Sequence, residues 1–256
     1  MTLGRPLRVL YAGDSPVGGP ANYLLGVLQF LKASVCHLPP TARLRPQLLG
    51  RRYDAIILSD FPARHAPTAG QQAIVRQVID GAGLLMIGGW ASFAGPDGGW
   101  RGSDVERLLP VTCRGRDDRL HLSGGALVLP AAEHPLVRSV PFTRPPVICG
   151  MNRVRAKRRS LLLLGAQEIR SRCQRAGGSF RVALHPVSHP LLVVDADPRR
   201  RVAAFATDLA PHWCAGLVDW GTRRVTLPVT PGVSVEVGNH YLSLVSALIR
   251  WLAVRR

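Results

Sequence analysis

Carboxylate side chains follow three short apolar runs of this chain, at the points where strands are expected to end. Asp14, Asp60 and Asp208 occupy these positions, where a side chain can bind a polar ligand or cap the next turn. A fourth apolar run ends in Gly88 and Gly89, which favour a tight turn. The four positions together indicate a polar binding site at the ends of strands.

Two side chains near these positions are candidate nucleophiles. Ser92 follows the glycine turn, and it could attack a substrate only with a base within about 3 Å; its alternative role is to cap a helix. Cys214 lies two residues after His212, and in an extended segment the two would share a face, so that the imidazole could activate the thiol. The alternatives are a buried thiol and a histidine that binds a loop carbonyl.

Three further side chains are candidate ligand contacts. Trp90 and Trp213 would supply apolar wall beside the carboxylates, although a packing role suits Trp213 better. Arg101, in the loop after the turn, could hold a substrate carboxylate. The sequence contains no HxH or HExxH spacing, no GxGxxG, no P-loop and no CxxC pair among its five cysteines. We therefore expect no metal site, no cofactor and no disulfide framework.

The elements that must position these residues alternate between strand and helix in the first part of the chain. Strands are expected at 7–12, 34–38, 54–59 and 84–87, and helices at 20–33 and 68–80, the second capped by Thr68. The strands are continuously apolar, which is typical of a parallel sheet covered on both faces. Because parallel strands share one carboxyl edge, we expect one concave surface there. It would be lined by Asp14, Asp60, Gly89, Trp90, Asp208 and His212.

The rest of the chain is less regular. We expect a short helix at 104–109, a proline-rich loop at 130–146, and strands at 161–164, 191–194 and 202–207, the last two joined in a hairpin through Asp197-Pro198. An amphipathic helix, with Asn239 as its cap, is expected at 239–254. Neither an internal repeat nor a long polar linker interrupts the chain. The sequence therefore predicts a single domain over residues 1–256.

The net charge of +17 raises the question of a polyanionic partner. The basic residues are almost all arginines and are dispersed. The densest clusters, at 153–159 and 199–201, are not interleaved with aromatics as a nucleic-acid stacking surface would be. This pattern favours a solvated surface shaped by the coding bias of a GC-rich genome. Weak, salt-sensitive polyanion binding is the alternative, and no specific nucleic acid is expected.

Localisation follows from what the sequence lacks. No apolar run approaches the ~20 residues that span a bilayer, and the N-terminal residues do not have the layout of a signal peptide. We therefore expect a cytoplasmic protein with no membrane partner.

Several segments resemble one protein family. The block GLLMIGGWASFAGPDGGWRGSDVERLLPV, which begins at Gly83, is the most specific, together with VAAFATDLAPHW. HPLVRSVPF, CGMNRVRAK and the terminal IRWLA add to the match. The chain resembles bacterial cytoplasmic proteins that are named as glutamine amidotransferases, within the class I glutamine amidotransferase-like superfamily. The resemblance implies an α/β fold of the three-layer, flavodoxin-like type with a mostly parallel sheet.

The chain departs from the superfamily at both catalytic positions. Members that hydrolyse glutamine carry a cysteine between glycines at a strand-to-helix turn, and a histidine and a glutamate two residues apart after a late strand. Residues 88–92 of this chain are Gly-Gly-Trp-Ala-Ser, and Cys214 stands two residues after His212 in place of the glutamate. The cysteine nearest to the turn in sequence is Cys113. The resemblance therefore predicts the fold and not the glutaminase reaction.

Three hypotheses about function follow. In the first, the protein has no glutaminase activity and binds a small polar ligand, or a partner protein, at the carboxyl edge of the sheet. In the second, it is a hydrolase or an amide-group transferase that uses Ser92 or Cys214 with His212. In the third, it is a weak polyanion-binding protein. The sequence does not decide the oligomeric state.

Overall fold

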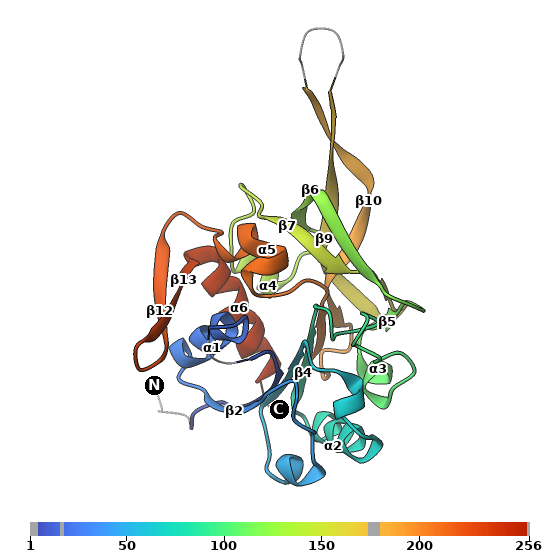
Figure 1. The fold of residues 1–256 in the computed structure, drawn as a ribbon, viewed down its shortest axis with the longest axis vertical. Helices are drawn as coiled ribbons and strands as arrows, with labels where there is room; N and C mark the ends of the chain where they lie inside the picture. Colours follow the sequence, from blue (N-terminus) through green and yellow to red (C-terminus); the bar gives the residue numbers. More distant parts are fainter. Residues whose placement is uncertain (1–4, 16–17, 174–179, 255–256) are drawn as a thin grey trace.

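Short, continuously apolar runs form the parallel half of a central nine-stranded sheet (Figure 1). The computed structural model describes residues 5–15, 18–173 and 180–254. In spatial order the parallel strands are β2 (Ser34–Leu38), β1 (Arg8–Gly13), β3 (Ala55–Ser59), β4 (Gly83–Ile87) and β11 (Val202–Phe205). Every residue of β3, β4 and β11 is buried. Such strands need cover on both faces, as their apolar composition predicted.

Four further strands, three of them longer, continue the sheet in antiparallel pairing. They are β10 (Phe180–Asp195), β9 (Ser160–Cys173), β6 (Arg119–Pro130) and β7 (Val147–Asn152), in that order beyond β11. The predicted hairpin through Asp197-Pro198 is present, since Leu192 pairs with Phe205 in antiparallel register. The fold is therefore mixed α/β, and the expectation of a mostly parallel sheet holds only for the first five strands. A sheet made of hairpins needs no crossover helices, which explains why this half of the chain has few.

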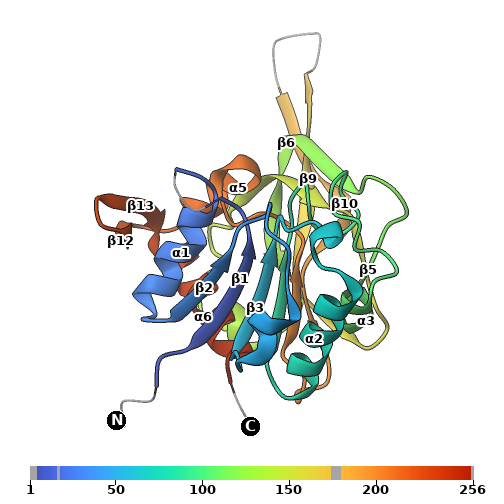
Figure 2. The same ribbon diagram turned by 60° about the horizontal axis from the view of Figure 1, so that its bottom comes forward.

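The outer parts of β9 and β10 extend well beyond the rest of the sheet as a two-stranded arm (Figures 1 and 2). Their pairing runs from Ser160 opposite Asp195 to Cys173 opposite Phe180. Only the inner parts, 161–164 and 191–194, carry the apolar signal that predicted strands. The arm itself contains exposed arginines and the exposed Pro186, a composition that does not predict a strand from sequence.

Helices lie on both faces of the parallel half (Figure 2). They are α1 (Ala21–Phe30) and α6 (Asn239–Leu252) on one face, and α2 (Thr68–Ile79) and α3 (Asp104–Leu108) on the other. The two predicted caps are wrong. Neither Thr68 nor Asn239 caps its helix, because the N-cap positions are Pro67 and Gly238. The Asn239 side-chain oxygen instead accepts the backbone N–H groups of Thr222 and Arg223, 2.9 and 3.1 Å away.

Shorter elements complete the structure. They are η1 (Pro46–Gly50), η2 (Ala63–His65), β5 (Val111–Cys113), α4 (Pro135–Arg138), β8 (Val154–Ala156), α5 (Pro211–Val218), β12 (Arg224–Thr230) and β13 (Val233–Gly238). β12 and β13 form a separate hairpin that packs on α1, where a Cβ on Gly26 would lie 3.0 Å from Leu227 Cβ. No helix among the described residues is long and apolar enough to cross a membrane.

The contact between β4 and the C-terminal helix provides a test of this packing. A Cβ on Gly83 would lie 2.3 Å from the backbone oxygen of Leu252 and 2.8 Å from its Cβ. The Gly83→Ala substitution must therefore push α6 away from the sheet, and we expect it to lower the free energy of unfolding by about 1–3 kcal/mol in urea denaturation. The control is Gly50→Ala, because a Cβ there meets no atom within 4 Å. The control should stay within about 0.5 kcal/mol of wild type; equal effects at both positions would contradict this packing.

Candidate functional site

The sheet changes its winding direction between β1 and β3. From β1 the chain crosses to β2 on one side, and from β3 it crosses to β4 on the other. In open α/β sheets, ligands bind beyond the carboxyl ends of the strands at such a position. Asp14 directly follows β1 and Asp60 directly follows β3. Both have positive φ values, 39° and 47°, a left-handed conformation that aspartate tolerates better than most residues and that turns the chain sharply at the strand end.

The Asp14 carboxylate is held in a buried position. The residue is 6% exposed, and Tyr11 donates its hydroxyl to Asp14 Oδ2 at 2.8 Å. Burial, followed by the negative charges of Asp208 and Asp60, raises the pKa of Asp14 to about 7. Burial disfavours the charged form of a carboxyl group, and nearby carboxylates act in the same direction. Asp14 can therefore release or accept a proton near neutral pH.

Asp60 is tied to the turn that follows β4. Its carboxylate accepts the backbone N–H of Ala91 at 2.7 Å and also that of Trp90. Burial raises the pKa of Asp60 to about 6, although the bonds from these N–H groups oppose the shift. The side chain is thus a carboxylate at neutral pH, and the backbone of the turn fixes its orientation.

Asp208 and His212 form a pair at the start of α5. Asp208 Oδ1 accepts the backbone N–H groups of Leu209 and Ala210 at 2.6 and 3.1 Å, while Oδ2 lies 3.3 Å from His212 Nδ1. The hydrogen bond and charge of Asp208 raise the pKa of His212. The imidazole side chain is 64% exposed, so it can reach a ligand while Asp208 holds its other nitrogen.

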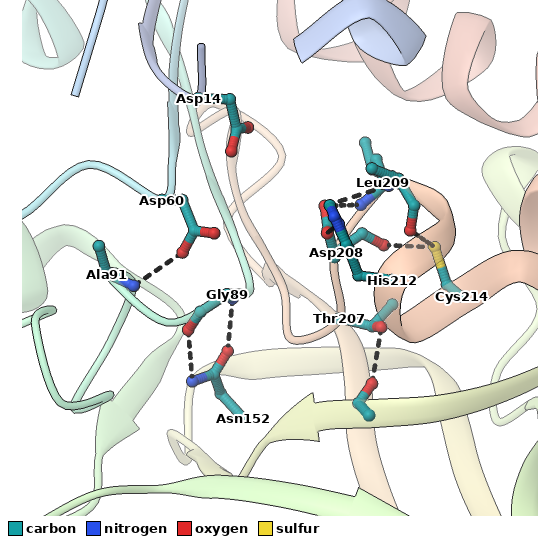
Figure 3. A network of polar contacts seen from close by, with 12 residues as sticks. Asp14, Asp60, Gly89, Ala91, Asn152, Thr207, Asp208, Leu209, His212 and Cys214 are labelled. Carbon is teal, nitrogen blue, oxygen red and sulfur yellow. Dashed lines mark hydrogen bonds and ion pairs between the residues drawn. The ribbon is translucent and has the colours of Figure 1, made fainter. Parts of the chain in front are cut away.

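These four side chains surround one space at the carboxyl edge (Figure 3). Asp14, Asp60 and Asp208 are close enough for their charges to influence one another, and His212 is coupled to all three. The structure thus brings together the acidic and imidazole groups that the sequence placed after separate strands. Three carboxyl groups and one imidazole can accept hydrogen bonds from a polar or cationic ligand, and they can transfer protons near neutral pH.

A buried asparagine fixes the glycine turn. Gly89 donates its N–H to Asn152 Oδ1 at 2.8 Å, and Asn152 Nδ2 donates to the Gly89 carbonyl at 3.1 Å and to Asp118 Oδ1 at 2.7 Å. Asn152 and Asp118 are 0% and 1% exposed. Gly89 also has no room for a side chain, because a Cβ would fall 2.0 Å from Asp60 Oδ1. The sequence interpretation missed both residues: Asn152 lies in the CGMNRVRAK block but was not singled out, and Asp118 belongs to no motif.

The segment after the turn differs from a nucleophile turn. No helix begins between Gly88 and Ser103, and α3 starts only at Asp104. The expected helix cap at Ser92 is therefore wrong. Ser92 is 1% exposed, and its hydroxyl oxygen accepts the backbone N–H of Asp60 at 3.1 Å. A hydroxyl in this position fixes the backbone of Asp60 and is inaccessible to a substrate.

Cys214 is likewise enclosed. The residue is 0% exposed, and its thiol donates to the carbonyls of Asp208 and Ala210 at 2.9 and 3.0 Å. Burial raises its pKa well above the ordinary value, so the group stays a thiol. The expected extended segment is in fact α5, where residues two apart point in different directions. His212 is exposed while Cys214 faces the core, and the two are not a nucleophile and its base.

Aromatic side chains lie beside the turn. Trp90 is 53% exposed, and the guanidinium carbon of Arg119 lies 3.9 Å from its ring centroid. His121 contacts Trp90 and Trp213 edge-on, with centroids 6.4 and 5.8 Å apart. Trp213 is buried against Gly150, so it packs as expected and leaves only Trp90 open. Arg119 and His121 carried no signal in the sequence.

Arg101 is not brought to the carboxylates. Its side chain is exposed and donates to the Gly115 carbonyl at 3.4 Å. Across residues 5–15, 18–173 and 180–254, no three His, Cys, Asp or Glu side chains are grouped as metal ligands.

The chain is similar to one described family and to several solved structures. Residues 44–226 match the family described as "Putative glutamine amidotransferase". A cytoplasmic protein from Salmonella typhimurium is 23% identical, with a TM-score of 0.62, over 81% of this chain and 90% of that one. A second, from Salmonella typhimurium LT2, is 25% identical with the same coverage and TM-score.

A more distant structure shares the fold over nearly the whole chain. It is described as a putative ThuA-like protein from Bacteroides uniformis, 14% identical over 96% of this chain and 91% of that one, with a TM-score of 0.55. No curated protein matches this chain.

The raised pKa of Asp14 predicts how stability changes with pH. The folded chain holds a proton on Asp14 that the unfolded chain releases between about pH 4 and pH 7. Stability is therefore lost as pH rises through this window. Asp14→Asn keeps an oxygen for the Tyr11 hydroxyl but carries no charge, so we expect it to be more stable than wild type by about 2–4 kcal/mol near pH 8. Near pH 4 the difference should be much smaller.

Urea denaturation at several pH values measures this effect. Asp80→Asn is the matched control, because Asp80 is exposed after α2; its pH profile should parallel that of wild type. If Asp14→Asn is no more stable than wild type near pH 8, Asp14 is not a strained, buried carboxyl group.

Proposed function

This chain belongs to the glutamine amidotransferase family that its residues 44–226 match, and we propose that it binds a small polar ligand at the carboxyl edge of its sheet without releasing ammonia from glutamine. Asp14, Asp60, Asp208 and His212 would contact the ligand. Trp90 would provide an apolar wall at the margin of this site.

One observation carries the proposal: the backbone N–H groups of the glycine turn are already bonded within the protein. Gly88 donates to the carbonyls of Phe205 and Thr207, at 2.8 and 3.1 Å. Gly89 donates to Asn152 at 2.8 Å, and Ala91 donates to the Asp60 carboxylate at 2.7 Å. Hydrolysis of an amide through a tetrahedral intermediate needs N–H donors aimed at the developing oxyanion. At this turn the Asp60 carboxylate already accepts the N–H of Ala91, so that donor is not available to an oxyanion.

The nucleophile argument supports the same conclusion. Residues 88–92 contain no cysteine, and no helix starts at this turn to lower the pKa of a thiol. Ser92 and Cys214 are both buried and hydrogen-bonded. The hydrolase or transferase hypothesis therefore receives no support from the accessible groups of the site.

The chemistry of the carboxyl edge indicates the kind of ligand. Three carboxyl groups converge there, and two of them have raised pKa values because they are buried and close to other carboxylates. A ligand with amino groups, or with several hydroxyl donors, would relieve this repulsion and satisfy the acceptors. The same carboxylates would repel an anionic ligand.

The finer description of the fold is part of the proposal. The parallel strands run in the order β2-β1-β3-β4-β11, which is the order of a flavodoxin-like sheet, and such sheets bind ligands at the β1/β3 position. With helices on both faces, this supports a three-layer, flavodoxin-like assignment for the parallel half. The Salmonella typhimurium proteins are described as cytoplasmic, and we propose the same compartment here.

The first test concerns glutamine. Purified protein should release no more ammonia from glutamine than a heat-denatured sample, because the turn lacks a thiol and its N–H groups are occupied. Glutamine-analogue alkylators that trap an activated thiolate should leave the native protein unlabelled. Steady ammonia release above the control, lost on Cys214→Ala or Ser92→Ala, would refute the proposal and identify the nucleophile.

The second test concerns the ligand. We expect 1,3-diaminopropane or glycerol to raise the melting temperature of wild type near pH 7, since a ligand that binds only the folded state stabilises it. Succinate, an anion of similar size, should have no such effect. Asp14→Asn should weaken the response to the diamine, whereas Asp80→Asn should respond as wild type does. If neither probe stabilises wild type, or if both variants respond equally, the carboxyl edge does not bind such ligands.

A further inference from the structure

The two densest basic clusters of the sequence meet in the fold. Residues 157–159 form the turn between β8 and β9, and residues 196–201 connect β10 to β11. Ala196 donates its N–H to the Arg159 carbonyl at 3.3 Å, which joins the two segments. The carboxyl edge lies where β11 ends, and this junction lies where β11 begins. The clusters therefore gather at the opposite edge of the sheet, away from Asp208 and His212.

A hollow of about 560 Å³ lies at this junction. Its charged lining consists of five cations and two carboxylates: Arg107, Lys157, Arg158, Arg159, Arg200, Asp195 and Asp197. The volume is within the range of pockets that hold small ligands. The remaining lining includes leucine, proline and alanine, and no aromatic side chain.

The carboxylates of the lining are engaged in the turn itself. Asp197 Oδ1 accepts the backbone N–H of Arg199 at 2.9 Å, and Asp195 Oδ1 accepts that of Asp197 at 3.0 Å. Asp195 Oδ2 also pairs with Arg200 Nε at 3.4 Å. By contrast, Arg158 and Arg159 form no ion pair with any described residue. Arg107 pairs with Asp104 at 2.7 Å, so the excess of positive charge in the hollow comes from Lys157, Arg158 and Arg159.

Lys157 is positioned before any ligand arrives. Its ammonium group donates to the carbonyls of Glu106 and Arg107, at 2.8 and 3.1 Å, at the end of α3. An ammonium has three N–H donors, so one is left for another acceptor. Burial lowers the pKa of this amine, and a bound anion would favour the charged form. A cation fixed in this way loses little side-chain entropy on binding.

We propose that this hollow binds a small compound with two or more negative charges on phosphate-type groups. Arginine side chains suit such groups because the planar guanidinium can donate two parallel hydrogen bonds to a phosphate. The absence of aromatic side chains from the lining means that recognition rests on the phosphates and not on a stacked base. The same phosphate chemistry also occurs in a nucleic-acid backbone, but that ligand would follow an extended stripe of cations, whereas these cations surround one hollow.

Isothermal titration with inorganic diphosphate tests the proposal. The Arg158→Gln/Arg159→Gln variant removes two cations whose side chains make no ion pair with the described residues, so it should fold as wild type does. We expect wild type to bind diphosphate and this variant to bind it about tenfold more weakly, or worse. The matched control is Arg43→Gln/Arg45→Gln, which removes the same charge from two exposed arginines elsewhere. The control should retain wild-type affinity.

Two results would overturn the proposal. One is no diphosphate binding by wild type, and the other is an equal loss of affinity in both variants, which would assign the effect to net charge alone. Fluorescence anisotropy with a labelled DNA duplex separates the two sources of phosphate. We expect both variants to weaken duplex binding equally and slightly, with a steep salt dependence. A loss of duplex binding confined to Arg158→Gln/Arg159→Gln, without diphosphate binding by wild type, would show that the hollow serves a nucleic acid instead.

Discussion

The geometry of the carboxyl edge depends on one buried side chain, the amide of Asn152. It bonds both the N–H and the C=O of Gly89, and it also donates to Asp118. The backbone N–H of Asn152 donates to the Ala206 carbonyl at 2.7 Å, just beyond β11. One residue at the end of β7 thus joins the turn after β4 to the end of β11, across the parallel and antiparallel halves of the sheet. A fully bonded buried amide is a rigid joint, because losing one partner leaves a polar group unsatisfied at a cost of about 1–3 kcal/mol.

The hydrogen bonds of Asn152 determine which groups the backbone of the glycine turn can bind. With Gly89 held by Asn152, the following N–H groups face Asp60, which accepts them. The same contacts bring Asp60 close enough to Asp14 and Asp208 for their charges to interact. Burial and mutual repulsion make the site costly to the folded state, and groups arranged in this way are characteristic of functional sites rather than of sites selected for stability. The backbone contacts of this turn therefore differ from those of a turn whose N–H groups are free to bind an oxyanion.

The sequence predicted the parts of the structure that local patterns specify. The strands around Ile56 and Leu85 have apolar runs long enough to identify, and the residues that follow them were placed at one edge by the topology of parallel strands. The outer arm was missed because Arg170 and Pro186 interrupt its apolar pattern. The two strands of the arm are held by hydrogen bonds to each other, which no local pattern within either strand specifies. The roles of Ser92 and Cys214 were also beyond the sequence, since burial and hydrogen bonds to Asp60 and Asp208 decide them. Asn152 lies within the CGMNRVRAK block, but its role could not be predicted from that block, because its partners Gly89 and Asp118 are 63 and 34 positions away in the sequence.

The distribution of charge shows which electrostatic effects decide the chemistry of each edge. A net charge of +17 favours ionised carboxylates throughout the molecule, yet the pKa of Asp14 is raised to about 7. Burial and two nearby carboxylates therefore outweigh many distant arginines, as expected when solvent screens charges beyond about 8 Å. The basic hollow lies across the sheet from this rim, a distance of roughly 15 Å for a strand of the length of β4. At that separation the two edges are nearly independent, so an acidic site and a basic site can coexist, each with the ligand chemistry of its own surroundings.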